Sequence, residues 1–217
     1  MLLAHSIPFP NRGTTAGGPR RSDGTRRGGA SVSRIAMGRY PAESLSVVVS
    51  QKIIAPINEQ IGNEFSAMLQ YYAIAAHFSA EALPELAAHF NSQAEEEKQH
   101  ALRFIEFLTD AGARVNIPSV PAPEAHFNVA EDAVKLSLQQ EERVTAQINA
   151  LVSIAKSESD FTTDNFLQWF VKEQLEEVAS MEQLLRVVQR AGEGNLLRVE
   201  EYLVREKGRG ASMSGEE

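Results

Sequence analysis

The sequence predicts an all-α protein: a four-helix bundle with a long connection between its second and third helices and a short fifth helix near the C-terminus. Ala, Leu, Glu, Gln and Val dominate residues 50–207, and these residue types are common in helices. Gly and Pro, which end helices, fall at only a few positions there. Apolar residues recur every three to four positions, which is typical of helices that bury one face.

The first helical pair is predicted from its prolines and one glycine. A helix over about 51–79 tolerates Pro56 because this proline falls in its first turns. Pro84 suits the first turn of a second helix, and Gly112 suits the residue after its end. Residues 117–123 contain several prolines and cannot be helical, so we expect an extended connection there.

The second pair is predicted in the same way. A third helix should cover about 129–158, and Asp160 or a neighbour should cap a fourth helix that ends near Gly192. A short fifth helix fits residues 195–207. The four long helices would each measure ~42–48 Å. The short turns make antiparallel hairpins, and the long connection returns the chain to the starting end of the bundle.

Both ends of the chain differ from this helical region. Residues 1–49 are rich in Gly, Pro, Ser, Thr and Arg and are predicted to be a disordered extension, or sequence upstream of a later start such as Met37. A targeting peptide and a basic DNA-binding arm are the alternatives. Residues 208–217 are predicted to be a flexible tail, which leaves 50–207 as a single domain.

Composition excludes several classes of protein. The 217 residues include no cysteine, which excludes disulfides, zinc–thiolate sites and iron–sulfur clusters and fits a cytoplasmic protein. No apolar run approaches the ~18 residues of a membrane span, so no membrane partner is expected. The net charge is −8, with the basic residues concentrated in the N-terminal extension. The acidic helical region argues against nucleic acid and suits cationic substrates.

Each long helix carries a carboxylate near the middle of its apolar face. Burying one unpaired carboxylate costs several kcal/mol, and burying four together costs more because like charges repel. No Lys or Arg falls on these faces to balance them, so bound cations are the simplest solution. Carboxylates with imidazole suit iron or manganese. The polar residues on these faces are Glu64, Glu97, His100, Glu141, Gln174 and Glu177.

Two short motifs support a metal site. Glu97-x-x-His100 places both side chains on one helical face, and Gln174-x-x-Glu177 repeats that geometry on the fourth helix. Either motif alone is more typical of a solvated pair on a helix surface. The specificity comes from one acid on each of four helices at compatible depth. The alternative is a structural bundle that binds no metal.

Three segments resemble the bacterial non-haem ferritins: residues 58–65 (NEQIGNEF), 94–100 (AEEEKQH) and 166–174 (FLQWFVKEQ). The resemblance extends over about residues 52–206. It implies the ferritin-like bundle, a hollow homo-oligomeric shell of 24 subunits, and storage of ferric mineral in that shell. It also implies a ferroxidase centre that oxidises Fe(II) with O2 or H2O2. The family's ligands fall on Glu64, Glu97, His100, Glu141 and Gln174, with Tyr71 beside the site.

The two metal positions are expected to differ. Glu97 should bridge the irons, with Glu64 and His100 completing one position. Glu141, Gln174 and Glu177 should complete the other, which lacks an imidazole and should therefore release oxidised iron more readily. Bacterioferritins and rubrerythrins resemble the pattern with Glu-x-x-His on two helices, and this chain departs from it. The resemblance implies iron as the metal and no haem. Met68 and Met181 look like core methionines.

Other acids give weaker predictions. Glu96, Glu173 and Glu176, together with Glu177, resemble a third iron site facing the cavity of the shell, or form a solvated acidic face. Asp164 resembles the acids that line the family's threefold iron channels.

A DNA-protecting mini-ferritin of twelve subunits is the competing function, and it would use the basic N-terminal extension. Mini-ferritins place their iron ligands between subunits, whereas these ligands lie on all four helices of one chain. The predicted fifth helix also argues against a mini-ferritin.

Overall fold

All the regular secondary structure in the described part of the chain is helical, as predicted, and the rest is connecting segments. The structure, a computed structural model, describes residues 47–213, with side chains to residue 208. Most of the N-terminal extension (1–46), including Met37, and residues 214–217 lie outside it. The four long helices agree with the predicted bounds to within about two residues. The elements are α1 (Gln51–Ala80), α2 (Pro84–Asp110), α3 (Ala130–Ser157), α4 (Phe161–Ala191), the short 3-10 helix η1 (Glu193–Asn195) and α5 (Leu197–Met213).

The predicted cap at Asp160 joins the first turns of two helices. Its carboxylate accepts hydrogen bonds from Thr163 N (3.0 Å) and Thr163 Oγ1 (2.8 Å) at the start of α4. The same carboxylate accepts one from Ser50 N (2.8 Å), just before α1. Backbone groups that the first turns of both helices would leave unpaired are therefore bonded by one side chain.

Helix α2 obtains its cap from the far end of the chain. It begins at Pro84, and Leu83 before it offers no side-chain cap. Instead the buried Glu200 carboxylate of α5 accepts hydrogen bonds from Glu85 N and Leu86 N, both 2.8 Å. Lys207 of α5 adds an ion pair with Glu85 (2.7 Å). These contacts attach α5 to the start of α2 and stabilise both.

Helix α5 is longer than predicted. It starts two residues later than the predicted start at residue 195 and runs to Met213, beyond the predicted end at residue 207. Glycine lowers helix stability by only about 1 kcal/mol, so Gly208 does not stop a helix that is already formed. Residues 208–213, assigned from sequence to the flexible tail, are therefore helical.

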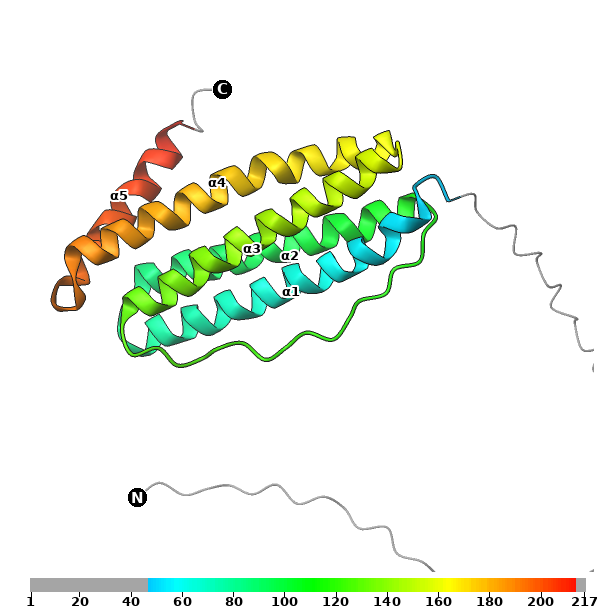
Figure 1. The fold of residues 1–217 in the computed structure, drawn as a ribbon. Helices are drawn as coiled ribbons and strands as arrows, with labels where there is room; N and C mark the ends of the chain where they lie inside the picture. Colours follow the sequence, from blue (N-terminus) through cyan, green and yellow to red (C-terminus); the bar gives the residue numbers. More distant parts are fainter. Residues whose placement is uncertain (1–46, 214–217) are drawn as a thin grey trace, which may run out of the picture. The chain divides into compact units, whose positions relative to one another are not determined.

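Two antiparallel hairpins, α1–α2 and α3–α4, lie side by side with their axes along the bundle (Figure 1). The connection between α2 and α3 runs along the bundle beside α1, as predicted for a long crossover (Figure 1). Within residues 47–213 no helix combines the length and the apolarity that a membrane crossing needs.

Side chains of α1 hold the crossover in place. Gln70 donates to the Glu124 carbonyl (2.8 Å) and accepts from Glu124 N (2.9 Å), as a neighbouring strand would. Asn58, nearer the start of α1, also holds the crossover: its Oδ1 accepts a hydrogen bond from Asn116 N (2.6 Å). Between them Gly62 lies so close to Pro118 that a Cβ atom at residue 62 would overlap the proline ring.

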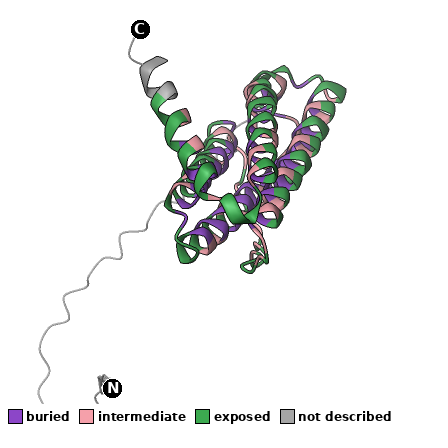
Figure 2. Ribbon diagram, turned by 90° about the vertical axis from the view of Figure 1, so that its left-hand side faces the viewer, coloured by how far each residue is buried: buried purple, intermediate pink, exposed green. Residues whose placement is uncertain are grey.

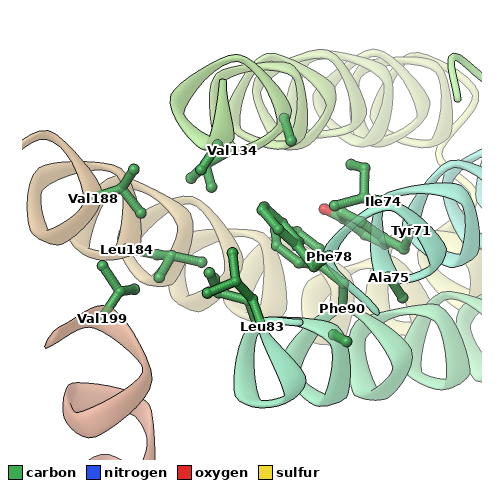
Figure 3. Close-up of a cluster of buried hydrophobic side chains, with 14 of the residues drawn as sticks. Tyr71, Ile74, Ala75, Phe78, Leu83, Phe90, Val134, Leu184, Val188 and Val199 are labelled. Atoms are coloured by element: carbon green, nitrogen blue, oxygen red, sulfur yellow. The ribbon is translucent and has the colours of Figure 1, made fainter. Parts of the chain in front are cut away.

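Buried residues lie on the faces that the helices turn toward one another (Figure 2) and form two apolar clusters. The first cluster includes Tyr71, Phe78, Phe90 and Met181 and extends to Val199 of α5 (Figure 3). Met68, predicted for the core, is only partly buried beside this cluster. The second cluster is built around Ile53, Ile57, Ile61, Phe104, Leu108, Ile148, Leu167 and Phe170.

Candidate metal centre

The polar residues predicted from the sequence lie between the two apolar clusters. Along each long helix one cluster ends before these residues and the other begins after them. Glu141 is fully buried and Glu64 is 1% exposed, and no Lys or Arg is buried anywhere in the described part. The buried set is Glu64, Glu97, His100, Glu141, Gln174 and Glu177.

Glu64, Glu97 and His100 form the first half of the centre, which we call the histidine half. One ligand atom from each of the three lies within 4.8 Å of the others, a spacing that suits a shared metal ion. His100 Nδ1 is 3.1 Å from Glu97 Oε2. Glu64 Oε2 is buried and has no hydrogen-bond partner in residues 47–213. A buried carboxylate oxygen without a partner is costly unless a cation binds it.

Tyr71, Glu141 and Gln174 form the second half, which we call the amide half. The Tyr71 hydroxyl donates to Glu141 Oε1. Gln174 Nε2 faces Glu141 Oε2 at 3.5 Å, and Thr145 Oγ1 donates to Gln174 Oε1 (2.9 Å). Both carboxylate oxygens of Glu141 and both polar atoms of Gln174 thus have protein neighbours.

The carboxyl groups of both halves are hard to ionise without a cation. Burial raises the pKa of Glu64 and of Glu97 well above the usual range, and the nearby carboxylates raise it further. Burial also raises the pKa of Glu141. Burial, with the charge of Glu141, raises the pKa of Glu177 to about 8. Burial and the Glu141 charge raise the pKa of the Tyr71 hydroxyl too. Bound cations would replace the protons that these groups otherwise hold.

A second group of possible ligands overlaps the first. His100, Glu173 and Glu177 also have ligand atoms within 4.8 Å of one another. Glu173 is half-buried, whereas the other two are buried. The structure thus brings Glu173 and Glu177 of the predicted third site together, beside the imidazole of the histidine half.

The remaining weaker candidates are Glu96, Glu176 and Asp164, which do not belong to this group. Glu176 is exposed and pairs with Lys172 (3.5 Å). Glu96 is exposed and accepts a hydrogen bond from Gln93, although its charge helps to raise the pKa of Glu177. Asp164 accepts from Gln168 Nε2 (2.9 Å), one turn along α4. None of the three belongs to a possible metal group among the described residues.

Sequence reasoning missed three residues that contact the centre. Gln60 donates to Glu64 Oε1 (2.9 Å) from one turn earlier on α1, a spacing that could have indicated it. Thr145 of α3 donates to Gln174 Oε1 (2.9 Å), and no motif indicates it. The Trp169 ring packs edge-on against His100, 5.5 Å between centroids, and Arg103 lies over its face at 3.8 Å. No sequence signal identifies that aromatic contact.

The fold and this cluster define a class of protein: four-helix bundles that hold a carboxylate-rich, histidine-bearing centre midway along their length. Comparison with known proteins agrees. The family model for the ferritin-like domain matches residues 54–191. The chain is 46% identical over 155 residues to the ferritin BfrB of Mycobacterium tuberculosis, covering 71% of this chain and 85% of that protein. The chain therefore belongs to the ferritin family.

More distant relatives agree. The bacterial non-heme ferritin of Staphylococcus aureus is 33% identical over 146 residues, covering 67% of this chain and 88% of that protein. The crystal structure of the open-pore ferritin of Archaeoglobus fulgidus superposes with a TM-score of 0.70 at 31% identity, covering 72% of this chain and 97% of that one. One of the M. tuberculosis relatives carries the name bacterioferritin BfrB, so the absence of haem stays a prediction.

Proposed function

We propose that this protein stores iron: it binds Fe(II) at a di-iron ferroxidase centre inside each subunit, oxidises it to Fe(III) and keeps the ferric mineral in a shell of 24 copies. The observation that carries the proposal is the group of four buried carboxylates, one from each long helix, with no buried cation among the described residues to balance them. Iron is the substrate and the stored cargo.

The ligand assignment follows the two halves. Glu97 bridges the two iron ions, because it neighbours both Glu64 and Glu141. Glu64 and His100 complete the position in the histidine half. Glu141, Gln174 and Glu177 complete the other position. Two Fe(II) ions held in this way each give one electron to O2 or H2O2, and the carboxylates stabilise the Fe(III) that forms.

Tyr71 and Glu173 have secondary roles. Tyr71 holds the Glu141 carboxylate through its hydroxyl and so fixes the ligand's orientation. Glu173, with Glu177 and His100, offers a third position through which iron passes between the centre and the cavity of the shell. Glu96 and Glu176 contribute negative charge near that position and attract cations toward it.

Self-assembly and a cytoplasmic location complete the proposal. Phe161 and Leu175 are 78% and 73% exposed, and apolar side chains of this size are often covered at subunit contacts. The relatives are ferritins, and the family relationship supports a closed homo-oligomer. A shell of 24 subunits fits this chain better than the twelve-subunit mini-ferritin, because all the candidate ligands lie within one bundle.

The decisive test removes two ligands of the histidine half. In a Glu97→Ala/His100→Ala protein the initial rate of Fe(II) oxidation should fall by about two orders of magnitude, because the bridging carboxylate and the imidazole are lost together. Stopped-flow absorbance after anaerobic Fe(II) loading measures this rate, and native mass measurement reports the number of subunits.

A Glu106→Ala/His126→Ala protein is the control, since both residues are exposed and neither belongs to a possible metal group among the described residues. If the Glu97→Ala/His100→Ala protein oxidised Fe(II) at the wild-type initial rate, the assignment of the site would be wrong. A particle of twelve subunits would instead favour the mini-ferritin.

A further inference from the structure

A cleft lies between α1 and α3, on the side of the centre formed by Glu64. It consists of a cavity of about 500 Å³ and a smaller one of about 80 Å³, and both have Asn63 and Gln147 in their walls. Pro118 and Pro121 of the crossover bound the larger cavity. The smaller cavity is lined by Asn63, Ser66, Ala67, Gln140, Arg143, Val144 and Gln147.

Two amide groups in this cleft have polar atoms without protein partners. Gln140 is 8% exposed, and its Nε2 has no hydrogen-bond partner in the described part of the chain. The buried Gln147 Oε1 also has none there. The first atom is a donor and the second an acceptor. A small molecule that both accepts and donates hydrogen bonds can satisfy them together.

A chain of hydrogen bonds connects the cleft to the metal centre. Asn63 Nδ2 in the cleft wall donates to Gln60 Oε1 (3.3 Å). Gln60 is buried and also lines the larger cavity, and its Nε2 donates to Glu64 Oε1 (2.9 Å). One buried amide side chain therefore separates the cleft from a carboxylate of the histidine half.

The charge of the cleft distinguishes it from the acidic side of the centre. Its charged wall residues are Glu59 and Arg143, both exposed, so their charges offset one another. Glu96, Glu173 and Glu176 instead come from α2 and α4 and carry three negative charges. Fe(II) is attracted to the acidic side, whereas the amide-lined cleft favours neutral molecules that form hydrogen bonds.

We propose that the α1–α3 cleft binds hydrogen peroxide and is the entrance by which peroxide reaches the di-iron centre, while Fe(II) enters from the acidic side. This rests on the proposed ferroxidase function. In the step that peroxide supports, its O–O bond breaks and it takes one electron from each of two Fe(II) ions. With two protons from solvent it leaves as two water molecules, and two Fe(III) ions remain.

A Gln140→Met/Gln147→Met protein tests the proposal, because methionine keeps the length of glutamine but forms no such hydrogen bonds. Gln139→Met, at an exposed position of the same helix, is the control. Each protein is loaded anaerobically with Fe(II) and mixed with H2O2 or with O2. Oxidation by H2O2 should slow about five- to tenfold at limiting peroxide, as expected for losing a hydrogen-bonded site. Oxidation by O2 and anaerobic Fe(II) binding should stay within about twofold.

The possible results separate the alternatives. An unchanged peroxide rate would mean that the cleft holds solvent water only, and would overturn the proposal. Equal slowing with both oxidants, or weaker Fe(II) binding, would also overturn it, because the substitutions would then act on the centre itself. If the wild-type protein neither binds nor oxidises Fe(II), the proposed function fails instead. Gln147→Met alone, at the less buried position, repeats the test if the double variant is not a folded shell.

Discussion

The histidine half and the amide half of the centre differ in what their polar atoms already contact. Glu64 Oε2 in the histidine half has no partner among residues 47–213. In the amide half Glu141 is held by Tyr71, and the Gln174 oxygen is held by Thr145. A metal ion entering the histidine half finds one carboxylate oxygen that no protein group occupies, whereas in the amide half every polar atom of Glu141 and Gln174 already has a protein neighbour with which the ion competes. The difference supports tight binding at one position and looser binding at the other.

Both halves contain buried carboxyl groups. Removing one of these ionisable groups is expected to have the largest effect, which is on the stability of the metal-free protein. Glu177 has its pKa raised to about 8, so the unfolded chain loses this proton near pH 4.5 while the folded chain keeps it. The metal-free protein should therefore lose stability as pH rises from about 4.5 to about 8, with no further loss from this group above that. Glu177→Gln should be more stable than wild type at pH 8 by a few kcal/mol and nearly equal at pH 4.5.

Thermal unfolding of the metal-free proteins at the two pH values measures this effect. Glu176→Gln, at an exposed position on the same helix, should leave the pH dependence unchanged. A stability difference for Glu177→Gln that did not vary with pH would contradict the explanation by buried charge.

An imidazole in the amide half should reduce the difference between the two positions. In Gln174→His, the second Fe(II) should bind about tenfold more tightly, because an imidazole replaces an amide oxygen that Thr145 already engages. Anaerobic Fe(II) titration by calorimetry gives the two affinities. Transfer of oxidised iron to mineral should slow as a result. Gln168→His on the exposed side of α4 is the matched control, and unchanged affinity in Gln174→His would show that the amide does not weaken the position.

The smallest expected effect comes from removing the hydrogen bond between Thr145 and Gln174 while Gln174 itself stays in place. Thr145→Val removes the hydroxyl that donates to Gln174 Oε1, so the second Fe(II) should bind about threefold more tightly, the value of a typical hydrogen bond. The same titration measures it. Thr109→Val, which removes an exposed threonine hydroxyl from α2, is the control. Weaker binding in Thr145→Val would mean that the hydroxyl positions the amide for the metal.

Local signals predicted most of the fold. Pro84, Asp160 and Gly192 mark helix ends through their own backbone chemistry, so the sequence places these boundaries well. The buried carboxylates were also predictable, because helical periodicity alone assigns them to the inner faces. The capping of α2 by Glu200 could not be predicted, since donor and acceptor lie more than a hundred residues apart.

The weaker site predictions depend on small rotations around a helix, which the sequence does not fix. Glu173 and Glu177 are one turn apart on α4, and both have ligand atoms close to His100 of α2, whereas Glu176 is exposed and pairs with Lys172. Likewise no sequence pattern reports that the Gln174 oxygen faces Thr145, because that contact depends on how α3 packs against α4.

The close approach of Gly62 to Pro118 has a consequence for the α1–α3 cleft. Both residues line its larger cavity, and the crossover is held on either side by Asn58 and Gln70. Any side chain at residue 62 would push the proline outward while the two amides kept the flanking segments fixed. The width of the opening is thus set by the absence of a single carbon atom, and even alanine at this position would change which molecules fit through it.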